Sequence, residues 1–126
     1  MENKIERLMD FNQNNLDQKL KEIGKLYAIV LKKYKETLYA LNKKEVELSN
    51  AWAERYSYYK CDYDFQLTNA EIKNFIDNDI ETSQLRLEIK NLKTDTEVLE
   101  KHLKNIESLR WDIKTLVEYL KLDRIV

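Results

Sequence analysis

The segment from Trp52 to Lys60 holds more side chains that could bind a ligand than any other stretch of this chain. It reads Trp-Ala-Glu-Arg-Tyr-Ser-Tyr-Tyr-Lys, so four large rings and two cations fall within nine positions. The residues spaced three or four apart, which gather on one side of a helix, are Trp52, Arg55, Tyr56 and Tyr59. Rings that stack on bases, beside cations that pair with phosphates, are typical of single-stranded nucleic-acid binding. The same spacing suits an aromatic core, so both interpretations stay open.

Arg55 falls on the apolar side of this predicted helix, three residues after Trp52. A buried guanidinium without a partner is costly. The apolar side must therefore open at Arg55 to solvent, to a carboxylate or to a phosphate. Glu54, Glu45 or an acid within residues 61–100 would serve as the carboxylate, so an ion pair and a ligand contact are both open.

A row of lysines leads along the same predicted helix toward that segment. At about 100° per residue the lysines fall within an arc of about 80°, and they extend along about 33 Å of helix. This lysine ridge consists of Lys21, Lys25, Lys32, Lys35 and Lys43. It lies about a third of a turn from the apolar stripe, and it is either solvated surface or a track for a phosphate backbone. The predicted DNA-binding residues are the ridge with Trp52, Arg55, Tyr56, Tyr58, Tyr59 and Lys60.

The residues that enzymes and metal sites need are missing. His102 is the only histidine and Cys61 the only cysteine, so no usual zinc site can form. Gly24 is the only glycine, which excludes a glycine-rich phosphate loop and a nucleophile elbow. We therefore expect no catalytic residue, no cofactor and no metal ion.

The composition predicts an all-α fold built from long amphipathic helices. Proline is absent, charged residues make up 36% of the chain and hydrophobic residues 43%. We expect one all-helical domain over residues 1–126, an elongated helical hairpin or bundle with a coiled-coil-like C-terminal helix. Its expected parts are an N-terminal arm (1–16), a long basic helix (17–60), a loop (61–67), a short helix (68–76) and a C-terminal oligomerisation helix (78–122).

Polar residues mark the expected helix ends. The run Asn12–Asn15 weakens helix, because asparagine side chains compete for backbone hydrogen bonds. Thr68 and Glu71 have the spacing of a capping box at the start of the short helix. Asn78 with Glu81 is expected to cap the last helix in the same way.

The C-terminal helix has the most regular pattern, with aliphatic residues every seven positions and others three or four later. Such a seam faces a partner helix along its whole length. The predicted seam consists of Leu85, Ile89, Leu92, Leu99, Leu103, Ile106, Leu109, Ile113, Leu116 and Leu120. The partner is the long basic helix, another subunit, or both. One hairpin cannot bury both apolar stripes, so we expect a homo-oligomer.

The net charge of −1 conceals a separation of charge along the chain. Residues 19–44 carry eight lysines and two acids, whereas residues 61–100 carry ten acids and four cations. This separation suits a basic face for a polyanion, or basic and acidic segments of neighbouring subunits that face each other. With one cysteine, no signal-peptide core and no membrane-length apolar run, we expect a soluble intracellular protein.

The chain resembles the UvsY family, the recombination mediators of tailed phages. The resemblance covers most of the chain and is most specific at Arg55 with the pair Tyr58-Tyr59, ahead of the capped short helix and the heptad helix. By position, Arg55 matches the arginine of the family's basic-aromatic motif. Ala53 stands where the family has a lysine, and Lys60-Cys61 follows the tyrosine pair where the family has a glycine.

The resemblance implies a small all-helical protein that forms a closed ring of identical subunits through its C-terminal helices. It implies binding of single-stranded DNA, and contact with a recombinase and with the single-strand-binding protein. It further implies help in loading the recombinase onto DNA covered by that protein, in the host cytoplasm if the chain is phage-encoded. A helical scaffold or assembly chaperone, acting only through protein contacts, explains the heptads equally well and is the alternative function.

Overall fold

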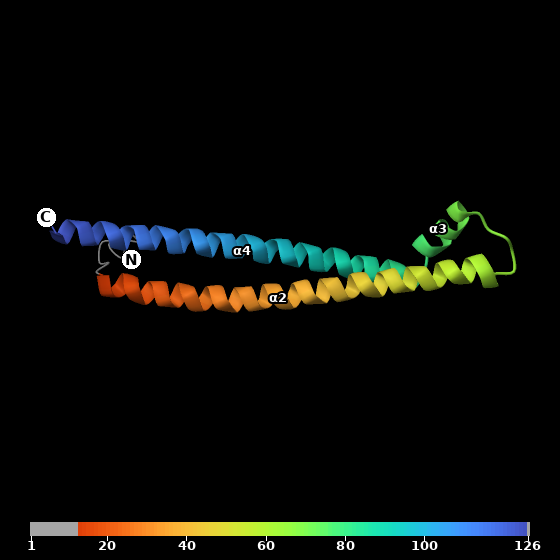
Figure 1. Cartoon of the computed structure of the whole chain (residues 1–126), viewed down its shortest axis with the longest axis horizontal. Helices are drawn as coiled ribbons and strands as arrows, with labels where there is room; N and C mark the ends of the chain where they lie inside the picture. Colours follow the sequence, from red (N-terminus) through yellow and green to blue (C-terminus); the bar gives the residue numbers. More distant parts are fainter. Residues whose placement is uncertain (1–12, 126) are drawn as a thin grey trace, which may run out of the picture. The chain divides into compact units, whose positions relative to one another are not determined.

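The computed structural model describes residues 13–125, with side chains described for residues 15–122. Helices take up nearly all of this range, which contains no strand. In chain order the elements are α2 (Gln13–Ser57), the π-helical turn η1 (Tyr58–Asp62), α3 (Asn69–Asp77) and α4 (Ile80–Ile125). Figure 1 labels α2, α3 and α4. The predicted all-α fold is confirmed. Most of the predicted arm, residues 1–12, lies outside the described residues.

The chain divides into two compact units, each built from part of α2 and part of α4. The terminal unit takes residues 13–33 of α2 and residues 99–125 of α4. The central unit takes Tyr34–Val98 and therefore includes η1 and α3. The predicted site segment, Trp52 to Lys60, lies wholly in the central unit.

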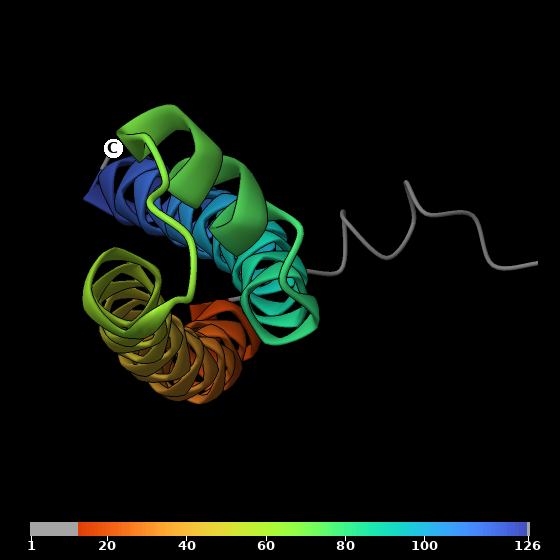
Figure 2. The same ribbon diagram turned by 90° about the vertical axis from the view of Figure 1, so that its right-hand side faces the viewer.

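The central unit packs the second part of α2 antiparallel to the first part of α4, with α3 beside the start of α4 (Figure 1, Figure 2). Aliphatic side chains from all three helices are buried in it. They are Leu41 and Ala51 from α2, Ile72 and Ile76 from α3, and Leu85 and Ile89 from α4. Each helix thus contributes one apolar face, as their amphipathic patterns require.

The start of α3 has the predicted capping box. The Glu71 amide donates to the Thr68 hydroxyl at 3.2 Å, and the Thr68 amide donates to Glu71 Oε1 at 3.2 Å. These two bonds satisfy donors that the first helical turn leaves without backbone partners. The prediction at Thr68 and Glu71 is therefore confirmed.

The predicted cap of α4 is wrong by one residue. Asp79, and not Asn78, accepts a hydrogen bond from the amide of Thr82, at 3.0 Å. Asn78 instead closes α3, because its side-chain amide donates to the carbonyl of Asn74 at 2.9 Å. Thr82 is fully buried and its hydroxyl donates to the Ile76 carbonyl at 2.6 Å, which ties α4 to the end of α3.

The terminal unit buries Leu16 and Ile23 of α2 and Val117 of α4. The hydroxyl of Tyr27 donates to a carboxylate oxygen of Glu107 at 2.9 Å. This bond raises the pKa of Tyr27, because the neighbouring carboxylate disfavours a phenolate. The two helix segments therefore pack through an apolar face with a polar bond at its edge.

The long helix begins and ends earlier than the expected range 17–60. It already includes Gln13–Asn15, in spite of the asparagines, because Leu16 one residue later is buried against the rest of the terminal unit. At the other end the α-helical pattern stops at Ser57, and the wider turn of η1 carries the chain to Asp62. A π turn of this kind often occurs at functional sites.

Candidate nucleic-acid interface

Arg55 is held by two carboxylates at the start of α4. Its Nε lies 3.1 Å from Oδ2 of Asp79, and its Nη2 lies 2.5 Å from Oε2 of Glu81. The side chain is 24% exposed. Burial alone would lower the pKa of Arg55, but hydrogen bonds to Glu81 and Asp79 raise it. The apolar stripe therefore opens at Arg55 onto a pair of acids from residues 61–100, one of the alternatives that the sequence left open.

Trp52, Tyr56 and Lys60 form a stack along one side of α2 and η1, and the Tyr56 hydroxyl donates to Oδ1 of Asn69 in α3 at 3.2 Å. The ring centroids of Trp52 and Tyr56 lie 5.3 Å apart with an interplanar angle of 11°. Nζ of Lys60 lies 5.6 Å from the centroid of Tyr56 and donates to its hydroxyl at 3.3 Å. Trp52 remains 38% exposed, so the stack presents rings and a cation to solvent.

Tyr58 and Tyr59 belong to a second group of rings, which also contains residues that sequence reasoning missed. Tyr59 stacks on Phe75 of α3 at 5.3 Å and 19°, and Tyr63 lies 5.4 Å from Tyr59. Phe65 continues the group, 6.0 Å from Tyr63. Tyr59 therefore fastens α3 to the end of α2, whereas Tyr58 is half exposed.

A signal for this second group was present in the sequence. Aromatic residues stand on both sides of the segment 61–67, and any short connection that turns the chain back brings its two flanks together. The group was missed because helical periodicity says nothing about contacts across a loop.

The lysine ridge is exposed on α2 in both units. Lys21, Lys25 and Lys32 belong to the terminal unit, and Lys35 and Lys43 to the central unit. Among the residues with described side chains, none of these five is in an ion pair. The structure brings Trp52, Tyr56 and Lys60 together, and Arg55 lies close by in the central unit but faces acids.

Lys44, next to the ridge, has a different role. Its Nζ lies 3.0 Å from Glu88 and 3.4 Å from Glu47, so it joins α2 to α4. The hydrogen bond from Lys44 lowers the pKa of Glu88. On α2 of the central unit, Lys44 therefore pairs with acids, whereas Lys35 and Lys43 form no ion pair with a described residue.

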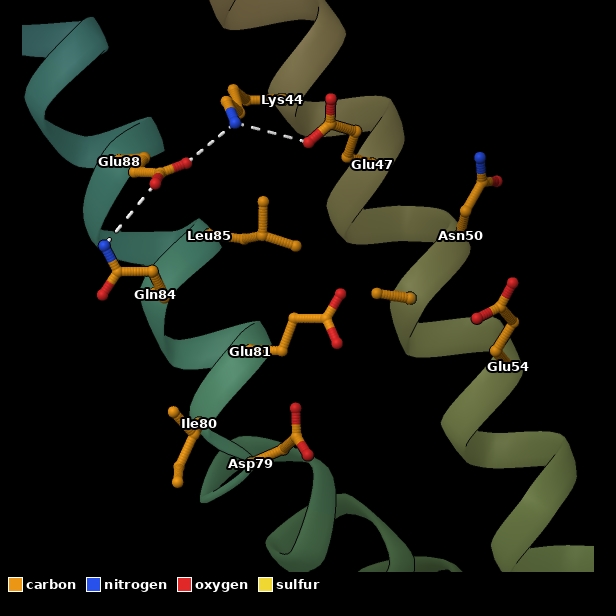
Figure 3. Close-up of a pocket in the computed structure, with 11 residues that line it drawn as sticks. Lys44, Glu47, Asn50, Glu54, Asp79, Ile80, Glu81, Gln84, Leu85 and Glu88 are labelled. Carbon is orange, nitrogen blue, oxygen red and sulfur yellow. Dashed lines mark hydrogen bonds and ion pairs between the residues drawn. The ribbon is translucent and has the colours of Figure 1, made fainter.

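The groove between α2 and α4 in the central unit is acidic. Figure 3 shows carboxylates directed into it from both helices, with Leu85 at its floor and Lys44 bridging at one end. The acids that line it are Glu47, Glu54, Asp79, Glu81 and Glu88. Lys44 and Arg55 pair with four of these five carboxylates, so the groove keeps a net negative charge, which disfavours a phosphate backbone.

The predicted seam of α4 divides into buried and exposed residues. Leu85 and Ile89 are buried within the central unit, whereas Leu109 is 51% exposed and Leu116 39% exposed in the terminal unit. The remaining six seam residues are partly buried: Leu92, Leu99, Leu103, Ile106, Ile113 and Leu120. Part of the seam thus serves packing within the chain, and part remains accessible to another subunit.

The described residues hold neither a candidate metal-binding cluster nor a candidate membrane-spanning helix. There, no group of three or more His, Cys, Asp or Glu side chains could hold a metal ion. Over the same range, no helix combines the length and apolar character that crossing a bilayer requires. His102 and Cys61 are both exposed.

Comparison with known proteins gives a family for the chain. No curated protein and no solved structure matches it. A family model described as the recombination, repair and ssDNA binding protein UvsY matches residues 4–124, nearly the whole chain. That description contains no enzymatic activity, and a surface of stacked rings and lysines beside an all-helical core fits it. The chain therefore belongs to the UvsY family of recombination, repair and single-stranded-DNA-binding proteins.

Proposed function

We propose that this protein is a recombination mediator, which binds single-stranded DNA and helps to load a recombinase onto DNA covered by single-strand-binding protein. The observation that carries the proposal is the stack of Trp52, Tyr56 and Lys60, a partly exposed aromatic surface with its own cation. Bases stack on such rings regardless of sequence, while phosphates pair with the cation. Membership of a DNA-binding family supports the same reading.

Arg55 joins this surface by exchanging its partners. In the free chain its guanidinium is neutralised by Asp79 and Glu81. A phosphate, like a carboxylate, accepts two parallel charge-assisted hydrogen bonds from a guanidinium, so a bound strand competes for Arg55 with the two acids. Contact with the strand thus involves a change of partner at Arg55, whereas Lys60 is already exposed.

One subunit alone binds the strand weakly. A stacked base contributes about 1–3 kcal/mol to the free energy of binding, and phosphate contacts weaken as the salt concentration rises. Assembly into a closed ring of identical subunits multiplies the contacts. Avidity of this kind raises apparent affinity by about 10²–10⁴ without any new contact. Such a ring bends the strand that it holds. The bend loosens the single-strand-binding protein from the strand, which the ring then presents to the recombinase.

The first test removes two cations from the proposed surface. Arg55→Ala combined with Lys60→Ala is expected to weaken binding to labelled oligo-dT and to make it less dependent on salt. For single strands each phosphate contact contributes about 0.7 to the slope of log affinity against log salt, so losing two contacts reduces the slope by about 1.4. Fluorescence titration across a salt series measures both quantities.

The matched control removes two paired cations from the same unit. Lys44 and Arg86 are bound to Glu88 and Asp77 within the chain, so Lys44→Ala with Arg86→Ala changes the net charge equally without touching the proposed surface. Wild-type affinity in the first double variant would disprove the assignment. Both double variants are then added to DNA covered by single-strand-binding protein, where only the first is expected to slow recombinase filament assembly.

The protein-only scaffold makes the opposite prediction. It requires no retention on single-stranded DNA cellulose at low salt, and filament assembly that is indifferent to the first double variant. Retention that salt reverses excludes it.

A further inference from the structure

Tyr39 is an exposed aromatic residue outside the stack of Trp52, Tyr56 and Lys60. Its side chain is 72% exposed on α2 of the central unit, compared with 38% for Trp52 and 50% for Tyr58. None of the ring contacts found among the described residues includes it. A single exposed ring is common on protein surfaces, so its neighbours decide what it does.

Tyr39 stands between two free lysines. Lys35 precedes it by four residues and Lys43 follows it by four, a spacing that places neighbouring side chains on one face with Cβ atoms about 5–6 Å apart. Both lysines are exposed, and neither forms an ion pair within the described part of the chain. The order on the helix face is therefore cation, ring, cation, over about 12 Å.

An arc of α2 of about 120° that includes Tyr39 carries no acid, and Glu36, three residues before Tyr39, stands at its edge. At about 100° per residue, nine residues between Lys35 and Ser57 fall within an arc of about 120° centred on Val46. All nine are exposed and none is Asp or Glu. Glu36 and Glu54 lie about 20° beyond one edge of the arc, and Glu45 lies about 40° beyond the other. The acidic groove borders the arc at Asn50, which lines it.

We infer that Tyr39 stacks on a base of single-stranded DNA while Lys35 and Lys43 pair with phosphates on either side of it. This inference rests on the proposed function and adds to the surface at Trp52 a second point of contact. Val46, 59% exposed three residues after Lys43, extends the uncharged face along which the strand continues.

The test separates the ring from the charges. Tyr39→Leu is expected to weaken binding to labelled oligo-dT by about 5- to 140-fold, the equivalent of the 1–3 kcal/mol that one stacked base contributes. Its salt slope is expected to stay at the wild-type value, because no phosphate contact is lost. Tyr39→Phe keeps the ring and is expected to bind as wild type. Lys35→Ala with Lys43→Ala is expected to reduce the slope by about 1.4.

Tyr119→Leu is the matched control. Tyr119 is 62% exposed in the terminal unit, and the residues four positions away are Thr115 and Asp123 in place of lysines. This variant is expected to bind as tightly as wild type. Circular dichroism on every variant checks that helix content is preserved.

The outcomes distinguish this inference from the proposed function. If wild type binds and Tyr39→Leu binds equally tightly, the role of Tyr39 is disproved while the proposed function stands. If Tyr39→Leu changes subunit number in light scattering and weakens binding only for that reason, Tyr39 is a subunit contact and the inference is overturned. If wild type itself ignores oligo-dT at low salt, the proposed function fails first.

Discussion

Asp79 performs two tasks with one carboxylate. Its Oδ2 accepts the amide of Thr82 at 3.0 Å, which caps α4, and it lies 3.1 Å from Nε of Arg55. The bond from the Thr82 amide lowers the pKa of Asp79 most; Arg55 lowers it further, and burial opposes both. The residue that begins the last helix therefore also holds the arginine of the proposed DNA-binding surface.

Two substitutions separate these tasks. Asp79→Ala removes both the cap and the charge, and it is expected to lower the free energy of unfolding by about 1–2 kcal/mol. Asp79→Asn retains a capping oxygen and loses only the charge, so its cost is expected to be smaller. Urea denaturation followed by circular dichroism at pH 7 measures both. Equal losses in the two variants would show that the cap contributes nothing.

The same variants test the dependence of stability on pH. Folding lowers the pKa of Asp79, so its contribution is complete above its unfolded pKa of about 3.9. The contribution is lost as pH falls through the folded value, because the unfolded chain then binds the proton more readily. Wild-type stability is therefore expected to decrease as pH drops below about 4, and Asp79→Asn to show a shallower decrease. An identical pH profile would contradict the lowered pKa of Asp79 in the folded chain.

At the scale of the element, α3 shows how a nine-residue helix is kept in place. A helix this short is unstable alone in water. The capping box at Thr68 closes its first turn, and Ile72 and Ile76 are 1% and 0% exposed. Phe75 of α3 also stacks on Tyr59 of η1, so this packing holds the end of α2 against α3.

Two isoleucines test this account with the same chemical change. Ile76→Ala deletes a fully buried side chain and is expected to cost about 2–5 kcal/mol. Ile80→Ala removes a side chain that is 87% exposed at the start of α4, and its effect is expected to stay within about 0.5 kcal/mol. Thermal or urea unfolding measures both. Comparable losses would mean that α3 is not packed as described.

Much of the fold could be predicted from the sequence because it depends on local patterns. The absence of proline, the apolar stripes and the Thr68–Glu71 spacing report on single helices, and these helices are present. The partner of Arg55 could not be predicted. It depends on where α4 begins, and Asn78 and Asp79 are equally plausible caps until the packing of α3 is known. The contacts of Tyr63 and Phe75 with Tyr59 could not be predicted either, because they depend on the path of the loop between η1 and α3.

At the scale of the whole molecule, α4 leaves large apolar side chains in solvent in each unit. Leu87 and Val98 are 54% and 47% exposed in the central unit; Leu109 and Trp111 are 51% and 70% exposed in the terminal unit. Leu87, Val98 and Leu109 lie on one side of α4, at intervals of eleven residues. They support the proposal that identical subunits assemble through α4.

Assembly is tested by placing charge on that surface. Leu109→Asp with Leu116→Asp is expected to yield a smaller species in light scattering and to reduce apparent affinity for long oligo-dT by about 10²–10⁴, as avidity is lost. Ser108→Asp with Thr115→Asp adds the same charge to exposed positions on another side of α4 and is expected to change neither. A wild-type protein that scatters as a monomer at micromolar concentration would refute assembly.

The pairing of Arg55 with Asp79 and Glu81 has a kinetic consequence for the proposed function. These acids stay within reach of Arg55 while a phosphate occupies it, so a bound strand always has an internal competitor. Such a contact exchanges quickly and cannot trap DNA. A protein that transfers its strand to a recombinase benefits from contacts of this kind. The total affinity is high, while the contact in each subunit dissociates easily.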